Sequence, residues 1–202
     1  MIKLIDKKLI VSFIIIVYLL SIVILTPYYY LNSNSVFSFL GVFATAFSLS
    51  SLIISVLCIK WQSIWNKYPL LSEKLFPNLN GNWEIKIEYV DKESKKTKNI
   101  LGECQIHQNI FNLSISIQTE TSESETLSIS AEKDPITGYI KLHYIYRNDV
   151  IKQYYHDNPD IYLGTAILQI RNDSNKLNGK YFTSRNSNGH FSISRISNEN
   201  SN

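Results

Sequence analysis

The chain has no Asp, Glu, Lys or Arg between Leu9 and Ile59, and this uncharged run constrains its fold more than any other feature. A helix needs ~20 apolar residues to cross a bilayer, so the run can supply two spans, at about residues 9–25 and 36–59. A cleaved signal peptide is disfavoured, because no small-residue cleavage pattern follows the first segment and a second span comes next. The remaining residues are too few to enclose two such helices in a soluble core.

The connector between the two spans, TPYYYLNSNS, predicts a turn with an aromatic belt, because it combines Pro27 with three tyrosines and polar residues. Basic residues flank the spans on the outer sides, at Lys3, Lys7, Lys8, Lys60 and Lys67, and the connector has none. The positive-inside bias therefore predicts a membrane hairpin with both ends of the chain in the cytoplasm.

Small residues recur on one face of the second span, at Ala44, Ser48, Ser51 and Ser55. Small side chains allow helices to approach closely in lipid. The stripe is expected to pack either against the first span of the same hairpin or against hairpins of other copies, and the sequence favours neither.

Charge separates the membrane part from the rest. Residues 1–76 carry six Lys and Arg against two Asp and Glu, whereas the following residues carry fourteen against fifteen. The excess of positive charge thus belongs to the membrane flanks, and no surface for duplex DNA or RNA is indicated. We divide the chain into a hairpin (1–61), a linker (62–76), a soluble domain (77–197) and a polar tail (198–202).

From Trp83 onward, apolar and polar residues alternate with a period of two, which predicts antiparallel strands. In the first strand Trp83, Ile85 and Ile87 share one face, and Glu84 and Lys86 share the other. Turn sequences such as DPITG separate the alternating segments. Eight strands are expected, at residues 83–89, 101–108, 110–119, 125–133, 139–147, 162–171, 177–183 and 190–196.

Short connections and an even number of strands favour an eight-stranded antiparallel up-and-down barrel, since closure removes edge strands. An open sandwich is the alternative fold. A barrel of eight strands is wide enough to be filled by side chains or to hold one small ligand, so its function depends on the interior residues.

The familiar enzyme signatures are absent from the sequence: there is no phosphate-binding glycine loop, HExxH or CxxC. Cys104 and His107 lie three residues apart on one strand, so they face opposite sides and do not form a metal site. We expect neither a catalytic residue nor a metal or other cofactor.

Aromatic and basic residues alternate near the end of the chain, in YIKLHYIYRN and YFTSRNSNGHFSISR. Tyrosine rings can stack on nucleobases, and the guanidinium groups of Arg185 and Arg195 suit phosphate oxygens. The opposing interpretation is that these tyrosines are ordinary strand residues and the arginines lie at the barrel rim.

A two-span hairpin followed by a barrel that opens on FPNLNGNW resembles the CBASS anti-phage effectors with two transmembrane helices and a β-barrel. The resemblance rests on Pro77, Gly81 and Trp83, on QNIFNLSISIQTETSES and LHYIYRN, and on LNGKYFTSRNSNGHFSISR. In this family the barrel is similar to calycins such as lipocalins and avidins. Gly81 and Trp83 resemble the G-x-W with which calycin barrels begin, where the indole plugs the closed end.

The resemblance implies that the cytoplasmic barrel binds a cyclic di- or oligonucleotide made by a partner cyclic-nucleotide synthase after phage infection. Ligand binding would promote self-association, and clustered hairpins would disrupt the membrane and kill the infected cell. The residues expected to contact the ligand are Tyr144, Tyr146, Thr183, Arg185 and Arg195. Two other functions are a membrane-tethered barrel that binds a lipid or small apolar ligand, and a membrane-anchored hydrolase.

Overall fold

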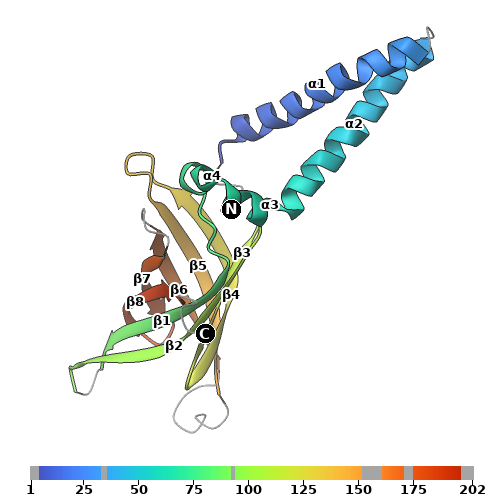
Figure 1. The fold of residues 1–202 in the computed structure, drawn as a ribbon. Helices are drawn as coiled ribbons and strands as arrows, with labels where there is room; N and C mark the ends of the chain where they lie inside the picture. The colour runs from blue at the N-terminus through green and yellow to red at the C-terminus, as the bar shows by residue number, and fades with distance from the viewer. Residues whose placement is uncertain (1–4, 33–35, 92–93, 152–160, 171–174, 197–202) are drawn as a thin grey trace, which may run out of the picture. The chain divides into compact units, whose positions relative to one another are not determined.

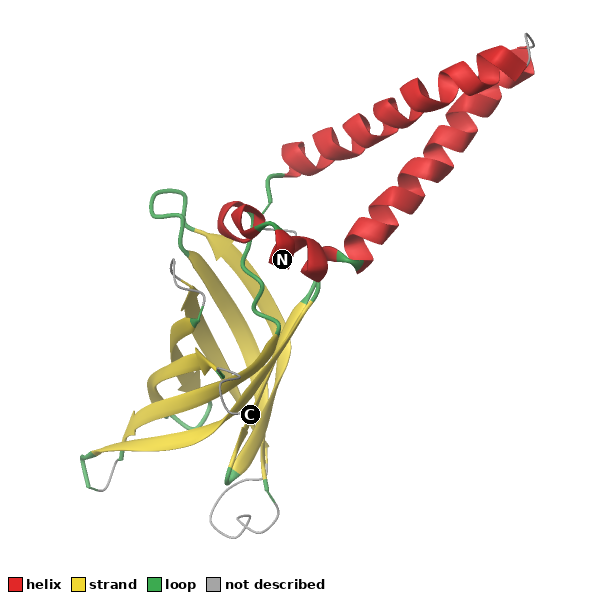
Figure 2. Cartoon of the chain, in the orientation of Figure 1, coloured by secondary structure: helices red, strands yellow, loops and turns green. Residues whose placement is uncertain are grey.

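The computed structural model describes residues 5–32, 36–91, 94–151, 161–170 and 175–196. The chain forms two compact units, one over Ile5–Ser72 and one that begins at Glu73 and contains every strand. Figure 2 shows the same division, with the helices in one unit and the strands in the other. The predicted polar tail and Arg171 lie outside the described residues.

The first unit contains the two long apolar helices, α1 (Lys7–Asn32) and α2 (Val36–Ile59), followed by α3 (Trp61–Lys67) (Figure 1). Segments of both long helices, Lys7–Tyr30 and Leu40–Ile59, are long and apolar enough to cross a membrane. A short helix, α4 (Pro69–Lys74), continues from α3 to the boundary of the second unit, so helix occupies most of the predicted linker.

The connector between the spans is shorter than the sequence predicted, because α1 continues through Pro27 to Asn32. Proline lacks only one backbone donor, and a helix in an apolar environment retains its other hydrogen bonds rather than expose them. Thr26, just before the proline, stabilises this part of the helix, because its hydroxyl donates a hydrogen bond to the Ile22 carbonyl at 2.8 Å.

The two long helices pack through Val42, Ala46 and Ser50 of α2, which are buried. The hydroxyls of Ser50 and the buried Ser21 of α1 lie 3.1 Å apart. The predicted small-residue stripe lies elsewhere on α2, and its four members, Ala44, Ser48, Ser51 and Ser55, are all exposed. Ala44 and Ser48 each lie two residues from the buried Ala46, which is about half a helical turn, so the stripe faces away from α1. It does not form the interface within the hairpin.

The second unit is a closed barrel in which each strand pairs with the next and β1 also pairs with β8, all antiparallel (Figure 1). This closure confirms the predicted up-and-down barrel and rules out the sandwich. The strands are β1 (Gly81–Val90), β2 (Thr97–Gln108), β3 (Leu113–Thr119), β4 (Ser122–Lys133), β5 (Ile140–Val150), β6 (Ile161–Ile170), β7 (Lys176–Thr183) and β8 (Asn188–Arg195).

The inward faces follow the predicted alternation, as Trp83 and Ile85 of β1 and Leu113 and Ile115 of β3 show. The largest error in a boundary concerns β2, which was expected to begin at Leu101 and begins at Thr97. In β5, which was expected to end at Arg147, the strand continues to Val150. The alternation persists there, with Asn148 and Val150 buried, but a polar residue at an inward position concealed it.

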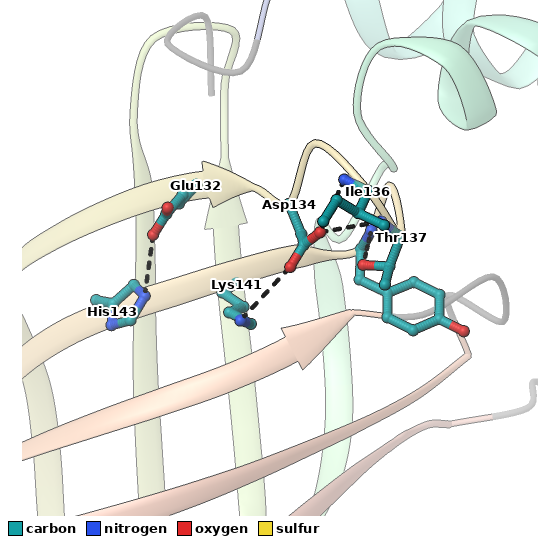
Figure 3. Close-up of polar contacts among 7 residues, drawn as sticks. Glu132, Asp134, Ile136, Thr137, Lys141 and His143 are labelled. Atoms are coloured by element: carbon teal, nitrogen blue, oxygen red, sulfur yellow. Dashed lines mark hydrogen bonds and ion pairs between the residues drawn. The ribbon is translucent and has the colours of Figure 1, made fainter.

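The turn between β4 and β5 has the expected Asp-Pro-x-x-Gly chemistry (Figure 3). The carboxylate of Asp134 accepts hydrogen bonds from the backbone N–H groups of Thr137 and Ile136, at 2.9 and 3.0 Å. These bonds hold the pKa of Asp134 below its usual value. Gly138 follows with φ of 71°, a conformation that favours glycine. The turn therefore forms from local interactions.

One end of the barrel is closed by the segment that precedes β1, within which Phe76, Pro77 and Leu79 are buried. Trp83 is 0% exposed, and its indole N–H donates to the Leu79 carbonyl at 2.9 Å. The chain enters β1 at Gly81, whose φ of 131° would strain any residue with a side chain.

Gln108, at the end of β2, fixes this closing segment. Its side-chain oxygen accepts from the Leu79 N–H at 2.6 Å, and its amide nitrogen donates to the Pro77 carbonyl at 3.0 Å. Its backbone N–H donates to the Asn80 side chain at 2.9 Å. Gln108 is itself buried, so these bonds satisfy polar groups that water does not reach.

Candidate functional site

A cavity of about 230 Å³ lies inside the barrel at the end opposite the closing segment. Its walls come from the last residues of β1, β3, β5 and β7 and the first residues of β2, β4, β6 and β8. The side chains that line it are mostly aromatic or hydroxylic. They are Ile85, Ile87, Tyr89, Ile100, Ile117, Thr119, Thr121, Ser122, Ser124, Tyr144, Tyr146, Asn148, Tyr162, Tyr181, Thr183, Arg185, Ser187 and Phe191.

Two of the predicted ligand residues, Tyr144 and Tyr146, line the cavity side by side, with ring centroids 5.9 Å apart. Tyr162 and Tyr181 add two further rings from β6 and β7. Burial raises the pKa of all four phenols, although Arg185 partly offsets the effect at Tyr162. The rings are therefore neutral at physiological pH and offer flat faces without repelling an anion.

Gly164 of β6 makes room for one of these rings, because a Cβ atom at this position would overlap the ring of Tyr146 across the β5–β6 ladder. The close approach fixes the ring against the wall. Tyr146 is thus held at the cavity surface by a pairing that the sequence did not reveal.

Arg185 and Thr183, both predicted as ligand residues, lie at the turn between β7 and β8 and also line the cavity. The guanidinium carbon of Arg185 lies 4.0 Å from the centroid of the Tyr162 ring. The turn is anchored by a hydrogen bond from the Thr183 N–H to the Ser187 carbonyl at 2.9 Å. A half-buried cation therefore stands beside neutral aromatic faces.

Arg195, the fifth predicted ligand residue, does not line this cavity. Its guanidinium lies 4.3 Å from the Trp83 ring and donates to the Asn78 carbonyl at 2.8 Å, at the closed end of the barrel. Burial lowers the pKa of Arg195. The prediction grouped it with Arg185 because both arginines alternate with aromatic residues in one segment, but a residue at the end of β8 lies a full strand length from the β7–β8 turn.

The sequence interpretation missed Asn148, which lines the cavity and is 6% exposed. It lies between Ser124 of β4 and Tyr162 of β6 in the strand register. Its amide nitrogen has no hydrogen-bond partner among the described residues. The available signal was its phase, because Asn148 follows Tyr144 and Tyr146 at intervals of two.

The remaining titratable residues within the described segments form no comparable site. Cys104 is buried, and the pKa of its thiol is raised to about 12 by burial. His107 is exposed on the opposite face of β2, and His143 is exposed with Nε2 3.7 Å from the Glu132 carboxylate (Figure 3). No group of three or more His, Cys, Asp or Glu side chains suitable for a metal ion occurs in the described part of the chain.

Comparison with known families shows what kind of barrel this is. The protein-family model described as "Cap15, cyclic dinucleotide receptor domain" matches residues 74–195, more than half of the chain. The chain belongs to this family. The matched segment of this Cap15 receptor domain contains all eight strands and hence the whole cavity. A comparison with curated proteins finds no match.

Membership of the Cap15 family confirms the resemblance to CBASS effectors. The barrel is a cyclic dinucleotide receptor domain, and two long apolar helices precede it. The narrower ligand class, a dinucleotide, replaces the broader expectation of a cyclic di- or oligonucleotide.

Proposed function

We propose that the chain is a membrane effector gated by a cyclic dinucleotide, which binds in the tyrosine-lined cavity of the barrel. The observation that carries this proposal is the position of Arg185 beside Tyr162, at 4.0 Å, within a cavity lined by neutral phenols. Aromatic faces stack on nucleobases, and a guanidinium group binds phosphate oxygens in pairs. The two kinds of contact correspond to the two parts of a nucleotide.

The size of the cavity supports partial enclosure of the ligand. Its volume of about 230 Å³ is smaller than the roughly 300 to 1,000 Å³ of pockets that enclose drug-sized ligands. One nucleoside of a cyclic dinucleotide fits inside, and the second lies at the mouth near Arg185. An exposed half of the ligand offers a surface to a second copy of the protein.

The long helices α1 and α2 are proposed to span the bacterial inner membrane, with both chain ends and the barrel in the cytoplasm. The lysines outside the spans and their absence from the connector support this orientation. The same compartment contains the synthase that would supply the ligand.

Ligand-driven self-association is proposed to disrupt the membrane. If the ligand binds assembled barrels more tightly than single ones, it shifts the equilibrium by that difference in affinity. The exposed stripe on α2, which includes Ala44 and Ser51, faces away from α1 and is available for contacts between hairpins. Clustered hairpins would then damage the membrane and end the infection by cell death.

The first experiment is to measure membrane potential in cells that express the chain with an active or an inactive cyclic-nucleotide synthase. Depolarisation is expected only with the active enzyme, and depolarisation without it would contradict gating. Ser51→Leu should abolish depolarisation without changing dinucleotide affinity. Thr45→Leu is the matched control, because Thr45 is equally exposed on α2 but lies outside the stripe.

The second experiment is a calorimetric titration of the full chain in lipid nanodiscs with cyclic dinucleotides. Tyr146→Ala and Arg185→Ala should each weaken binding at least about fivefold, since stacking and charge-assisted contacts are worth about 1–3 kcal/mol each. A barrel that instead retains lipid in native mass spectrometry, with unchanged affinity in Arg185→Ala, would favour the apolar-ligand alternative.

A further inference from the structure

Asn148 is the one polar side chain of the cavity wall that is both more than nine-tenths buried and short of a hydrogen-bond partner in the described residues. A buried donor without a partner costs about 1–3 kcal/mol, so such a group in a native fold calls for an explanation. A hydrophobic residue would fill this inward position of β5 more favourably, as Leu142 does nearer the closed end.

We infer that Asn148 reads the edge of a nucleobase and selects cyclic dinucleotides that contain adenine or uracil over those that contain guanine. This inference rests on the proposed function of the cavity and adds the base preference of the site. A side-chain amide presents one donor and one acceptor next to each other. Adenine and uracil present the complementary pair, an acceptor beside a donor, on one edge.

The surroundings of Asn148 support this assignment. Its neighbours across the ladders are Ser124 and Tyr162, which also line the cavity. A base stacked on the Tyr146 ring, two residues before Asn148 on β5, would lie against the same wall and extend its edge toward the amide. The buried position keeps water from competing for the amide, and this strengthens the discrimination between bases.

Guanine fits the same wall less well. Its pairing edge carries the O6 acceptor, N1–H and N2–H₂ in a row, so an amide can bond O6 and N1–H but leaves N2–H₂ over, whereas a carboxylate satisfies both donors with its two acceptor oxygens. No Asp or Glu occurs among the described residues that line the cavity. Guanine bound against Asn148 would therefore leave its N2–H₂ donor without a carboxylate acceptor, whereas adenine has a C–H group and uracil an acceptor at that position.

The test is to titrate the full chain in nanodiscs with cyclic di-AMP, cyclic di-UMP and cyclic di-GMP, for the parent and for Asn148→Asp. The parent should bind the adenine or the uracil ligand about tenfold more tightly than the guanine ligand, as expected when one buried donor of guanine is left unpaired. Asn148→Asp replaces the donor by a second acceptor, so the ratio of affinities should shift about tenfold toward guanine.

Two further variants separate base reading from charge and packing. Ser124→Asp places the same negative charge beside Asn148 but keeps the amide. It should weaken all three ligands through repulsion of their phosphates and leave the ratio unchanged. Asn148→Leu should keep the barrel folded, which far-UV circular dichroism would verify, and weaken the adenine or uracil ligand about tenfold.

The outcomes distinguish the role of Asn148 from the receptor function and from an effect of charge. A parent protein that prefers guanine, or an unchanged ratio in both Asn148→Asp and Asn148→Leu, would overturn the role of Asn148 and leave the receptor function intact. If the parent protein bound none of the three dinucleotides, both the role of Asn148 and the proposed receptor function would be overturned. A ratio that also shifts in Ser124→Asp would assign the effect to charge and contradict the proposed contact.

Discussion

The two ends of the barrel are built from the same eight strands with the same alternation of inward and outward residues, but they differ in how their inward polar groups are hydrogen-bonded. At the closed end, Gln108 and the Trp83 indole are hydrogen-bonded to backbone groups of the closing segment. At the open end, tyrosines surround a cavity, and the amide nitrogen of Asn148 has no partner in the described chain. The comparison indicates that hydrogen-bond satisfaction, more than polarity, distinguishes a structural end from a binding end.

Trp83→Ala should have the largest effect and should act on the closed end alone. Trp83 is fully buried, and truncating a buried aromatic side chain costs about 3 to 5 kcal/mol. We expect the free energy of unfolding, measured with denaturant and far-UV circular dichroism, to fall by that amount. Phe182→Ala is the control, because Phe182 is 51% exposed. If Trp83→Ala melted like the parent but no longer bound dinucleotide, the tryptophan would belong to the binding site.

Gln108→Leu should give the second largest loss of stability. The change keeps the size of the side chain but leaves the Leu79 N–H and the Pro77 carbonyl without their partner. A buried unsatisfied group costs about 1–3 kcal/mol, so a decrease in the free energy of unfolding by about 2 kcal/mol is expected. The matched control is Gln105→Leu, which alters an exposed glutamine on the same strand. Equal losses in both variants would show that the closing segment does not depend on Gln108.

The arginines at the two ends of the barrel should differ in their effect on dinucleotide affinity. Arg195→Ala removes the contact with the Trp83 ring and should lower the free energy of unfolding by about 1 kcal/mol, with dinucleotide affinity unchanged. Arg185→Ala removes a similar contact with the Tyr162 ring, so it should lower the free energy of unfolding by a comparable amount but, unlike Arg195→Ala, also weaken the ligand. Titration and denaturant unfolding of both variants would test the contrast. A loss of affinity in Arg195→Ala comparable to that in Arg185→Ala would return Arg195 to the ligand set.

The strands and their faces could be predicted because they follow from local chemistry. The alternation of Trp83, Ile85 and Ile87 fixes which face is buried. Asp134 stabilises the β4–β5 turn by accepting hydrogen bonds from residues two and three positions later. The uncharged run likewise predicts two long helices. These features depend on residues close in sequence, so one sequence contains the information needed.

The residues that were misplaced depend on contacts between distant segments. Arg195 is bonded to Asn78, more than a hundred positions earlier in the chain, so its position at the closed end had no local signal. Asn148 was assigned to a loop because polar residues in inward positions look like the end of a strand. The hairpin interface was left open since small residues occur on several faces of α2, and only its packing against α1 selects Ser50 over Ser51.

Cys104 gives the smallest predicted effect and tests whether the wall beside Trp83 is dry. Cys104 is paired with Trp83 between β1 and β2, and burial raises the pKa of its thiol to about 12. An unfolded cysteine ionises near pH ~8.5. Above that pH the unfolded state releases a proton that the folded state retains, so stability is constant below it and falls as the pH rises. The loss at pH 9.0 should be about 0.8 kcal/mol.

Ionisation of the buried tyrosines on unfolding lowers stability in the same direction, but mainly above pH ~9, because unfolded tyrosine has a pKa near ~10. Denaturant unfolding between about pH 8 and pH 9 therefore isolates the thiol. Cys104→Ala lowers stability by a constant amount and should remove the decline within this window, so the slope against pH is the measurement that matters. A parent protein with no decline would mean that the folded thiol ionises as readily as the unfolded one. In that case water would reach the wall beside Trp83, and the dry closed end would not extend to Cys104.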